Sequence, residues 1–144
     1  MNGERIAVKN FEQYIKMYQN ESASNTKDNK IAYIKAGDRW EVGIGVSDGH
    51  LQQVSFVNSI CTSKGGKHVD YIAQKIVDYL TPIVKRKTKK DVKPMMIKQY
   101  LYIFVNCMIE NPAFDSQTKE TLTTVSKVIL LIYDSFYLEI WFFT

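Results

Sequence analysis

A change of apolar periodicity constrains the fold of this chain more than any other feature. Across residues 30–58 apolar and polar residues alternate with period two, which is typical of half-buried strands. Across residues 69–84 the apolar residues instead recur every three or four positions, which predicts one long amphipathic helix. A largely apolar run at 100–109 predicts a further strand. This order predicts an α+β domain in which helices cover one face of a single sheet.

Two glycine–aspartate pairs divide the alternating segment into three predicted strands. Gly37-Asp38 and Asp48-Gly49 separate residues 30–36, 39–47 and 51–58. Glycine accepts the positive φ that a two-residue hairpin turn requires, so we expect an antiparallel meander. One face of the second predicted strand carries Trp40, Val42, Ile44 and Val46.

The N-terminal segment predicts a short strand at 5–9 and then a separate helix. Asn10 is a candidate N-cap for this helix. The helix has one apolar face, formed by Phe11, Tyr14, Ile15 and Tyr18. The polar residues 21–29 predict a loop. Because the first eleven residues contain no apolar run of signal-peptide length, we expect no secretory leader.

Length and composition predict one self-sufficient domain. A chain of 144 residues, 45% of them hydrophobic, is long enough to bury a core without disulfides or a metal. Cys61 and Cys107 lack the spacing of a zinc or redox motif, so we expect two free, buried thiols in an intracellular protein. No phosphate loop, HExxH helix or GxSxG elbow occurs. Gly43 and Gly45 form a lone GxG, which we interpret as a bulge or a close backbone approach.

The residues around the start of the long helix allow more than one interpretation. His50 and His68 have no paired nucleophile, so we expect capping or surface roles for both. Gly65-Gly66 lies just before the helix, between two lysines. The pair serves either as a flexible connection into the helix or as an anion site built from the unpaired helix amides.

Two sets of cations are candidate binding residues. Lys85, Arg86, Lys87, Lys89 and Lys90 follow the apolar stripe of the long helix. A helix C-terminus attracts cations, but five exceed what its dipole explains, so the cluster predicts contact with a phosphate backbone. The net charge of +4 also favours an anionic partner. The second candidate is Lys119, in the polar segment 114–120, where an ammonium would sense a nucleotide phosphate.

Five segments of the chain resemble one protein family, the eukaryotic type IIA DNA topoisomerases. They are DRWEV at 38–42, QQVSFVNSI at 52–60, KGGKHVDY at 64–71, VKP at 92–94 and FVNCMIENPAFDSQTKE at 104–120. The resemblance covers residues 1–124 and corresponds to the transducer domain, the second half of the ATPase region, with details most like the plant enzymes. It implies a two-layer, mostly antiparallel fold with a left-handed βαβ crossover.

The same resemblance implies the roles of six residues. Gln117, Thr118 and Lys119 match the QTK loop, whose lysine reaches the γ-phosphate of ATP in a neighbouring GHKL-type lobe. Lys85, Arg86 and Lys87 match the DNA-contacting segment, although the linker to Val92 is shorter here. ATP is the implied cofactor, with Mg²⁺ held by the nucleotide lobe. The implied setting is a nuclear, homodimeric enzyme that couples ATP hydrolysis to passage of double-stranded DNA.

The departures from the family limit what this chain does alone. Neither the nucleotide lobe nor the DNA-cleaving tyrosine region is present, so we expect no catalytic residue and no resident metal in the chain. The alternatives are a truncated, non-catalytic DNA-binding fragment and a truncated product without a selected function.

Residues 125–144 form an apolar tail unlike the family. Val125-Ser126 is what a splice-donor GUAAGU encodes, which suggests intron read-through. Asp134 and Glu139 interrupt the tail, so we expect no membrane partner.

Overall fold

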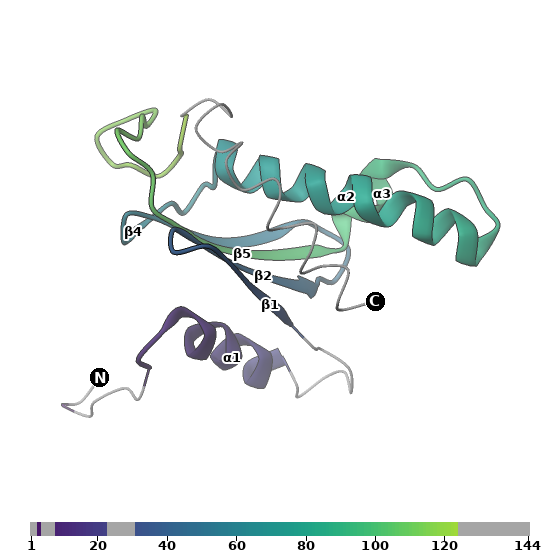
Figure 1. Ribbon diagram of the computed structural model, residues 1–144, viewed down its shortest axis with the longest axis horizontal. Coiled ribbons are helices and arrows are strands. Elements are labelled where there is room, and N and C mark those ends of the chain that lie inside the picture. Colours follow the sequence, from purple (N-terminus) through teal and green to yellow (C-terminus); the bar gives the residue numbers. More distant parts are fainter. Residues whose placement is uncertain (1–2, 4–7, 23–30, 124–144) are drawn as a thin grey trace.

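The computed structural model describes residues 3, 8–22 and 31–123. These residues form three helices and one five-stranded sheet with strand order β1-β2-β5-β3-β4 (Figure 1). The elements along the chain are α1 (Phe11–Ser22), β1 (Ala32–Ala36), β2 (Trp40–Val46), β3 (Gln52–Val57), β4 (Ile60–Cys61), α2 (Lys67–Thr88), α3 (Pro94–Gln99) and β5 (Leu101–Cys107). The predicted α+β class is therefore confirmed.

Strand pairing is mostly antiparallel, as predicted. β1 with β2, β2 with β5, and β3 with β4 are antiparallel, whereas β3 and β5 are parallel. The connection from β3 to β5 runs through β4, α2 and α3, which makes a βαβ unit; its left-handedness stays a prediction.

The predicted meander of three consecutive strands is wrong, because β5 lies between β2 and β3. β5 takes the central position because it is apolar on both faces: Ile103, Phe104 and Val105 are each fully buried. The turn at Asp48-Gly49 reverses the chain but does not make its two strands neighbours.

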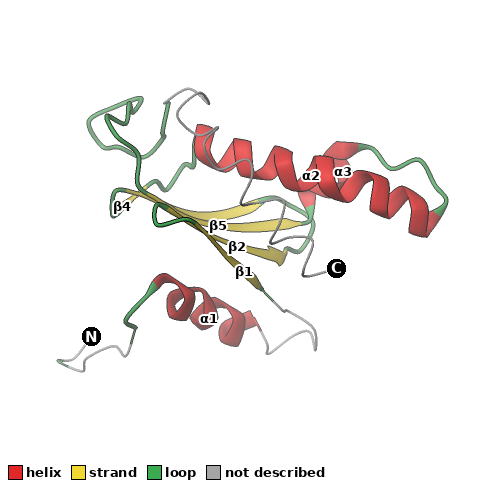
Figure 2. Ribbon diagram, viewed as in Figure 1, coloured by secondary structure: helices red, strands yellow, loops and turns green. Residues whose placement is uncertain are grey.

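Helices lie on both faces of the sheet, which corrects the predicted two-layer arrangement with helices on one face. Figure 2 shows α2 and α3 on one side of the strands and α1 on the other. The first core contains Val69, Ile72 and Ile76 of α2 packed against Ile103 and Val105.

The second core joins α1 to the opposite face through Phe11, Ile15 and Phe104. Gly43 permits this contact, since a Cβ at this position would lie 2.7 Å from Ile15 Cδ1 and 3.2 Å from Phe104 Cβ. The predicted close approach at Gly43 is confirmed. Sequence periodicity identified the apolar face of α1 but contained no signal for the sheet face that it covers.

The start of α1 follows the predicted capping. Asn10 Oδ1 accepts a hydrogen bond from the Gln13 amide at 2.9 Å, which confirms Asn10 as the N-cap. The helix continues to Ser22, two residues into the predicted loop. The strand predicted at 5–9 and the rest of that loop lie largely outside the described residues.

The long helix α2 includes Pro82 and ends at Thr88, where Lys89 adopts the left-handed conformation as its C-cap. The sequence predicted only a break at residues 92–94, whereas Pro94 is the first residue of the short helix α3. Among the described residues, none of the helices has the length and apolar character needed to cross a membrane.

The two cysteines differ in exposure. Both thiols are free, but only Cys107 is buried, and burial raises its pKa to about 12. Cys61 is exposed, so the predicted burial is wrong for this residue. It lies in the two-residue strand β4 at the edge of the sheet, where little covers it.

Candidate functional site

The segment after β5 forms a loop with a closed base. The Thr123 amide donates to the Ala113 carbonyl at 2.8 Å, and the Asp115 amide donates to the Thr121 carbonyl at 3.2 Å. These bonds join the two ends of the loop. In Figure 1 the loop stands beside the N-terminal end of α2.

Backbone contacts attach this base to the start of α2. The Lys67 amide donates to the Leu122 carbonyl at 3.0 Å, and the Leu122 amide donates to the Gly65 carbonyl at 3.1 Å. Gly66 has φ +139, and a Cβ there would lie 2.5 Å from both the nitrogen and the oxygen of Leu122. Gly65-Gly66 is therefore a point of close backbone approach. It is not a flexible connection, and the Lys67 amide is no longer free for an anion.

A charged pair reinforces the attachment at the surface. Lys64 Nζ lies 2.6 Å from Glu120 Oε2, and the Lys64 amide donates to the Glu120 carbonyl at 3.0 Å. The hydrogen bond to Glu120 raises the pKa of Lys64. Such an exposed pair contributes little to stability, but it fixes the residue next to Lys119.

A buried polar network lies beneath this attachment. Ser55 Oγ lies 2.6 Å from Thr62 Oγ1, and Thr62 Oγ1 lies 3.1 Å from His68 Nε2. The Gln53 amide side chain donates to the Ser63 carbonyl at 2.9 Å. These bonds hold residues 62–63, which lead directly into Gly65-Gly66.

His68 is completely buried, so the predicted capping or surface role is wrong for this residue. Burial lowers its pKa to about 4, and its Nδ1 has no hydrogen-bond partner in the structure. The imidazole is therefore neutral at pH 7. The sequence offered a usable signal, because His68 directly precedes the apolar stripe of α2. His50 is exposed, and its Nε2 lies 3.0 Å from the Gln52 amide nitrogen.

The tip of the loop presents the three predicted ATP-contacting residues together. Gln117, Thr118 and Lys119 are all exposed. The Lys119 amide donates to the Ser116 carbonyl at 3.2 Å, and Lys119 has φ +55, which is uncommon for a residue other than glycine. Its ammonium lies 5.9 Å from the centre of the Phe114 ring, an exposed and weak cation–π contact. The base of the loop is fixed, and the lysine head group faces solvent.

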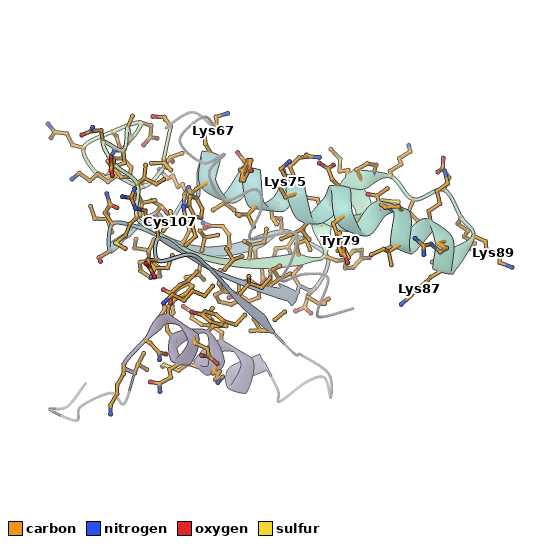
Figure 3. All side chains as sticks on the ribbon, in the orientation of Figure 1. Lys67, Lys75, Tyr79, Lys87, Lys89 and Cys107 are labelled. Carbon is orange, nitrogen blue, oxygen red and sulfur yellow. The ribbon has the colours of Figure 1, made fainter. Side chains whose placement is uncertain are left out.

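The predicted DNA-contacting residues lie at the other end of α2. Lys85, Arg86 and Lys87 form its last turn and are not brought near the loop. Figure 3 shows Lys67 at one end of the helix and Lys87 and Lys89 at the other. At a rise of 1.5 Å per residue, Lys67 and Lys85 are about 27 Å apart along the axis.

The basic turn is only partly neutralised. Lys85 Nζ lies 3.0 Å from Asp91 Oδ1, and both side chains are largely exposed. No other ion pair joins this turn to the described residues. Within the described part of the chain, no three His, Cys, Asp or Glu side chains form a group able to hold a metal ion.

Comparison with known proteins identifies the class to which this fold and site belong. Residues 10–132 match the family model described as DNA gyrase B. The protein "DNA topoisomerase 2 top-2" of Caenorhabditis elegans is 50% identical over 130 residues, which are 88% of this chain and 9% of that protein. The predicted closeness to plant enzymes is not confirmed, since this relative is a nematode protein.

Two solved structures agree with this similarity. The crystal structure of the ATPase region of Saccharomyces cerevisiae topoisomerase II matches with a TM-score of 0.76 and 44% identity, over 88% of this chain and 31% of that one. The ATPase and transducer domains of DNA topoisomerase II from Balamuthia mandrillaris match with a TM-score of 0.74 and 38% identity, over 84% and 30%. The fold is thus part of a type II DNA topoisomerase ATPase region. The chain belongs to the DNA gyrase B family and spans about a tenth of the length of the curated relatives it matches.

Proposed function

We propose that this chain is the transducer part of a type II DNA topoisomerase and that Lys119 is its ATP-sensing residue. One observation carries the proposal: an exposed tip with Gln117, Thr118 and Lys119 stands on a base fixed to α2. A loop of this kind presents a cation at a constant position. ATP bound in a neighbouring lobe supplies the phosphate that the cation contacts.

The energy of such a contact is sufficient for a switch. Two unit charges about 4 Å apart interact by about 4 kcal/mol at an effective dielectric of 20, before desolvation. Removal of the γ-phosphate by hydrolysis removes this interaction and releases the tip. Because the loop base is bonded to α2 through Gly65 and Lys67, a force on the tip acts on the helix as a whole.

The DNA-contacting role is assigned to Lys85, Arg86 and Lys87 at the far end of α2. Three exposed cations in one turn displace counterions when they approach a phosphate backbone, and this makes their affinity salt-dependent rather than sequence-selective. One rigid helix then carries the nucleotide response at one end and the DNA response at the other.

The complete protein in this proposal is a nuclear homodimer that couples ATP binding and hydrolysis to passage of one DNA duplex through another. Its nucleotide lobe holds ATP with Mg²⁺, and its cleavage core acts on DNA. Residues 1–124 are the transducer unit. Residues 125–144 are a divergent tail of read-through origin, which sequencing of the gene across residue 124 tests.

Replacing Lys119 in the complete enzyme tests the nucleotide role. We expect Lys119→Ala to lower DNA-stimulated ATP turnover at least tenfold, whereas Lys35→Ala, at an exposed lysine of β1, leaves it unchanged. Thermal unfolding of the isolated chain should be the same for both variants, because both side chains are exposed. Wild-type turnover in Lys119→Ala would contradict the proposal.

Replacing the basic turn tests the DNA role. Alanine at Lys85, Arg86 and Lys87 should flatten the salt dependence of DNA binding by about 0.9 in log–log slope per lost phosphate contact. Nucleotide binding should stay unchanged. DNA binding of the isolated chain with no effect of Lys119→Ala on the complete enzyme would instead favour the non-catalytic DNA-binding fragment.

A further inference from the structure

An apolar groove opens between α3, the C-terminal half of α2 and the ends of β2 and β5. Its volume is about 420 Å³, and its walls include Val46, Leu80, Val84, Met96, Ile97 and Tyr100. It lies away from the loop tip, and neither proposed contact with ATP or DNA uses it. The groove therefore needs a separate explanation.

The groove continues the first core but lacks a cover. Along β2, Trp40 and Val42 are buried under α2, whereas Val46 on the same face is 65% exposed. Met96 and Tyr100 are also more than half exposed. Adjacent apolar side chains left open to water are characteristic of a surface that binds another apolar segment.

We propose that this groove binds the C-terminal segment of the same chain, residues 131–144. The segment reads LIYDSFYLEIWFFT, and ten of its fourteen residues are aliphatic or aromatic. These residues lie outside the described part of the chain. Their composition matches the apolar walls of the groove.

The chain is long enough for this contact. Leu122 is bonded beside Gly66 at the start of α2, and Val84 in the groove wall lies eighteen residues further along that helix. At 1.5 Å per residue the distance along the helix is about 27 Å. An extended chain covers about 3.3 Å per residue, so about eight residues after Leu122 reach the groove. Residues 131–144 are then available to fill it.

The charges are complementary as well. The only charged residues of the segment are Asp134 and Glu139, and both are acidic. The groove wall residue Val84 directly precedes Lys85, Arg86 and Lys87, the basic turn of α2. A second copy of the folded domain would instead bring a like-charged basic turn to the same place.

Photocrosslinking of the full chain tests the proposal. A p-benzoylphenylalanine replaces Met96 in the groove wall, and the same group at Met95 is the matched control, because Met95 is 71% exposed on the same helix and does not line the groove. Far-UV circular dichroism verifies that both variants fold. Mass spectrometry of an equal mixture of ¹⁴N- and ¹⁵N-labelled protein identifies the crosslinked peptide and its chain of origin.

We expect position 96 to crosslink to residues 131–144 of the same chain at least five times more than position 95 does. Phe136→Lys in the segment should reduce that yield. Crosslinks between ¹⁴N and ¹⁵N chains would overturn the proposal and identify the groove as an interface between copies. Equal yields at positions 95 and 96, or crosslinks that avoid the segment, would also overturn it.

Discussion

Gly66→Ala is the substitution that the structure predicts to release the loop from α2. The glycine has φ +139 and ψ −165, a backbone region that is essentially restricted to glycine and costs other residues about 1–3 kcal/mol. The added Cβ would lie 2.5 Å from two backbone atoms of Leu122, and no rotamer change relieves such a contact.

The expected loss of stability follows from these contacts. Separating the two backbones breaks the Lys67–Leu122 and Leu122–Gly65 hydrogen bonds, each of which contributes about 0.5–1.5 kcal/mol. Together with the backbone strain, the free energy of unfolding should fall by about 3–5 kcal/mol. Urea denaturation followed by circular dichroism measures this loss.

Gly49→Ala is the matched control, because Gly49 also has a positive φ of +103 but a Cβ there meets nothing within 4 Å. It should cost only the backbone strain of about 1–2 kcal/mol. Trypsin should cleave after Lys119 faster in Gly66→Ala than in the control, since only the first variant frees the loop base. Equal losses of stability and equal cleavage rates would refute the described attachment.

Two further predictions concern the cores. Phe104→Ala should lower the free energy of unfolding by about 3–5 kcal/mol in urea denaturation, because the ring is fully buried between α1 and the sheet; a loss below about 1 kcal/mol would contradict this packing. Lowering the pH from 6.5 to 4 should destabilise the protein, because His68 binds a proton in the unfolded state near its ordinary pKa of 6.5 and in the folded state only near 4. His68→Gln should make the measured stability less dependent on pH in this window, and an unchanged slope would count against a buried neutral histidine.

Local patterns predicted the elements of the fold better than their arrangement. Asn10 as an N-cap and the apolar stripe of α2 depend on neighbouring residues, and both predictions are confirmed. The place of β5 between β2 and β3 depends on competition among strands for burial on both faces. That competition is settled by the whole sheet, and a hairpin signal at Asp48-Gly49 cannot report it.

The candidate site shows the same division. The cations at 85–87 and the exposed loop at 117–119 follow from composition and turn residues, and the structure places them on a helix end and a loop tip. The contact of Gly66 with Leu122 joins residues 56 positions apart, so no local pattern predicted it. The burial of His68 depends on Thr62 and on the sheet beneath it, which are likewise distant information.

The central claim is that Lys119 contacts the terminal phosphate of ATP in the complete enzyme. Photoaffinity labelling with an ATP analogue that carries its reactive group on the γ-phosphate tests it most directly. We predict label on the loop tip, residues 116–119, and its loss when unmodified ATP competes. A labelled enzyme whose label lies only on other segments, with none on this tip, would contradict the account.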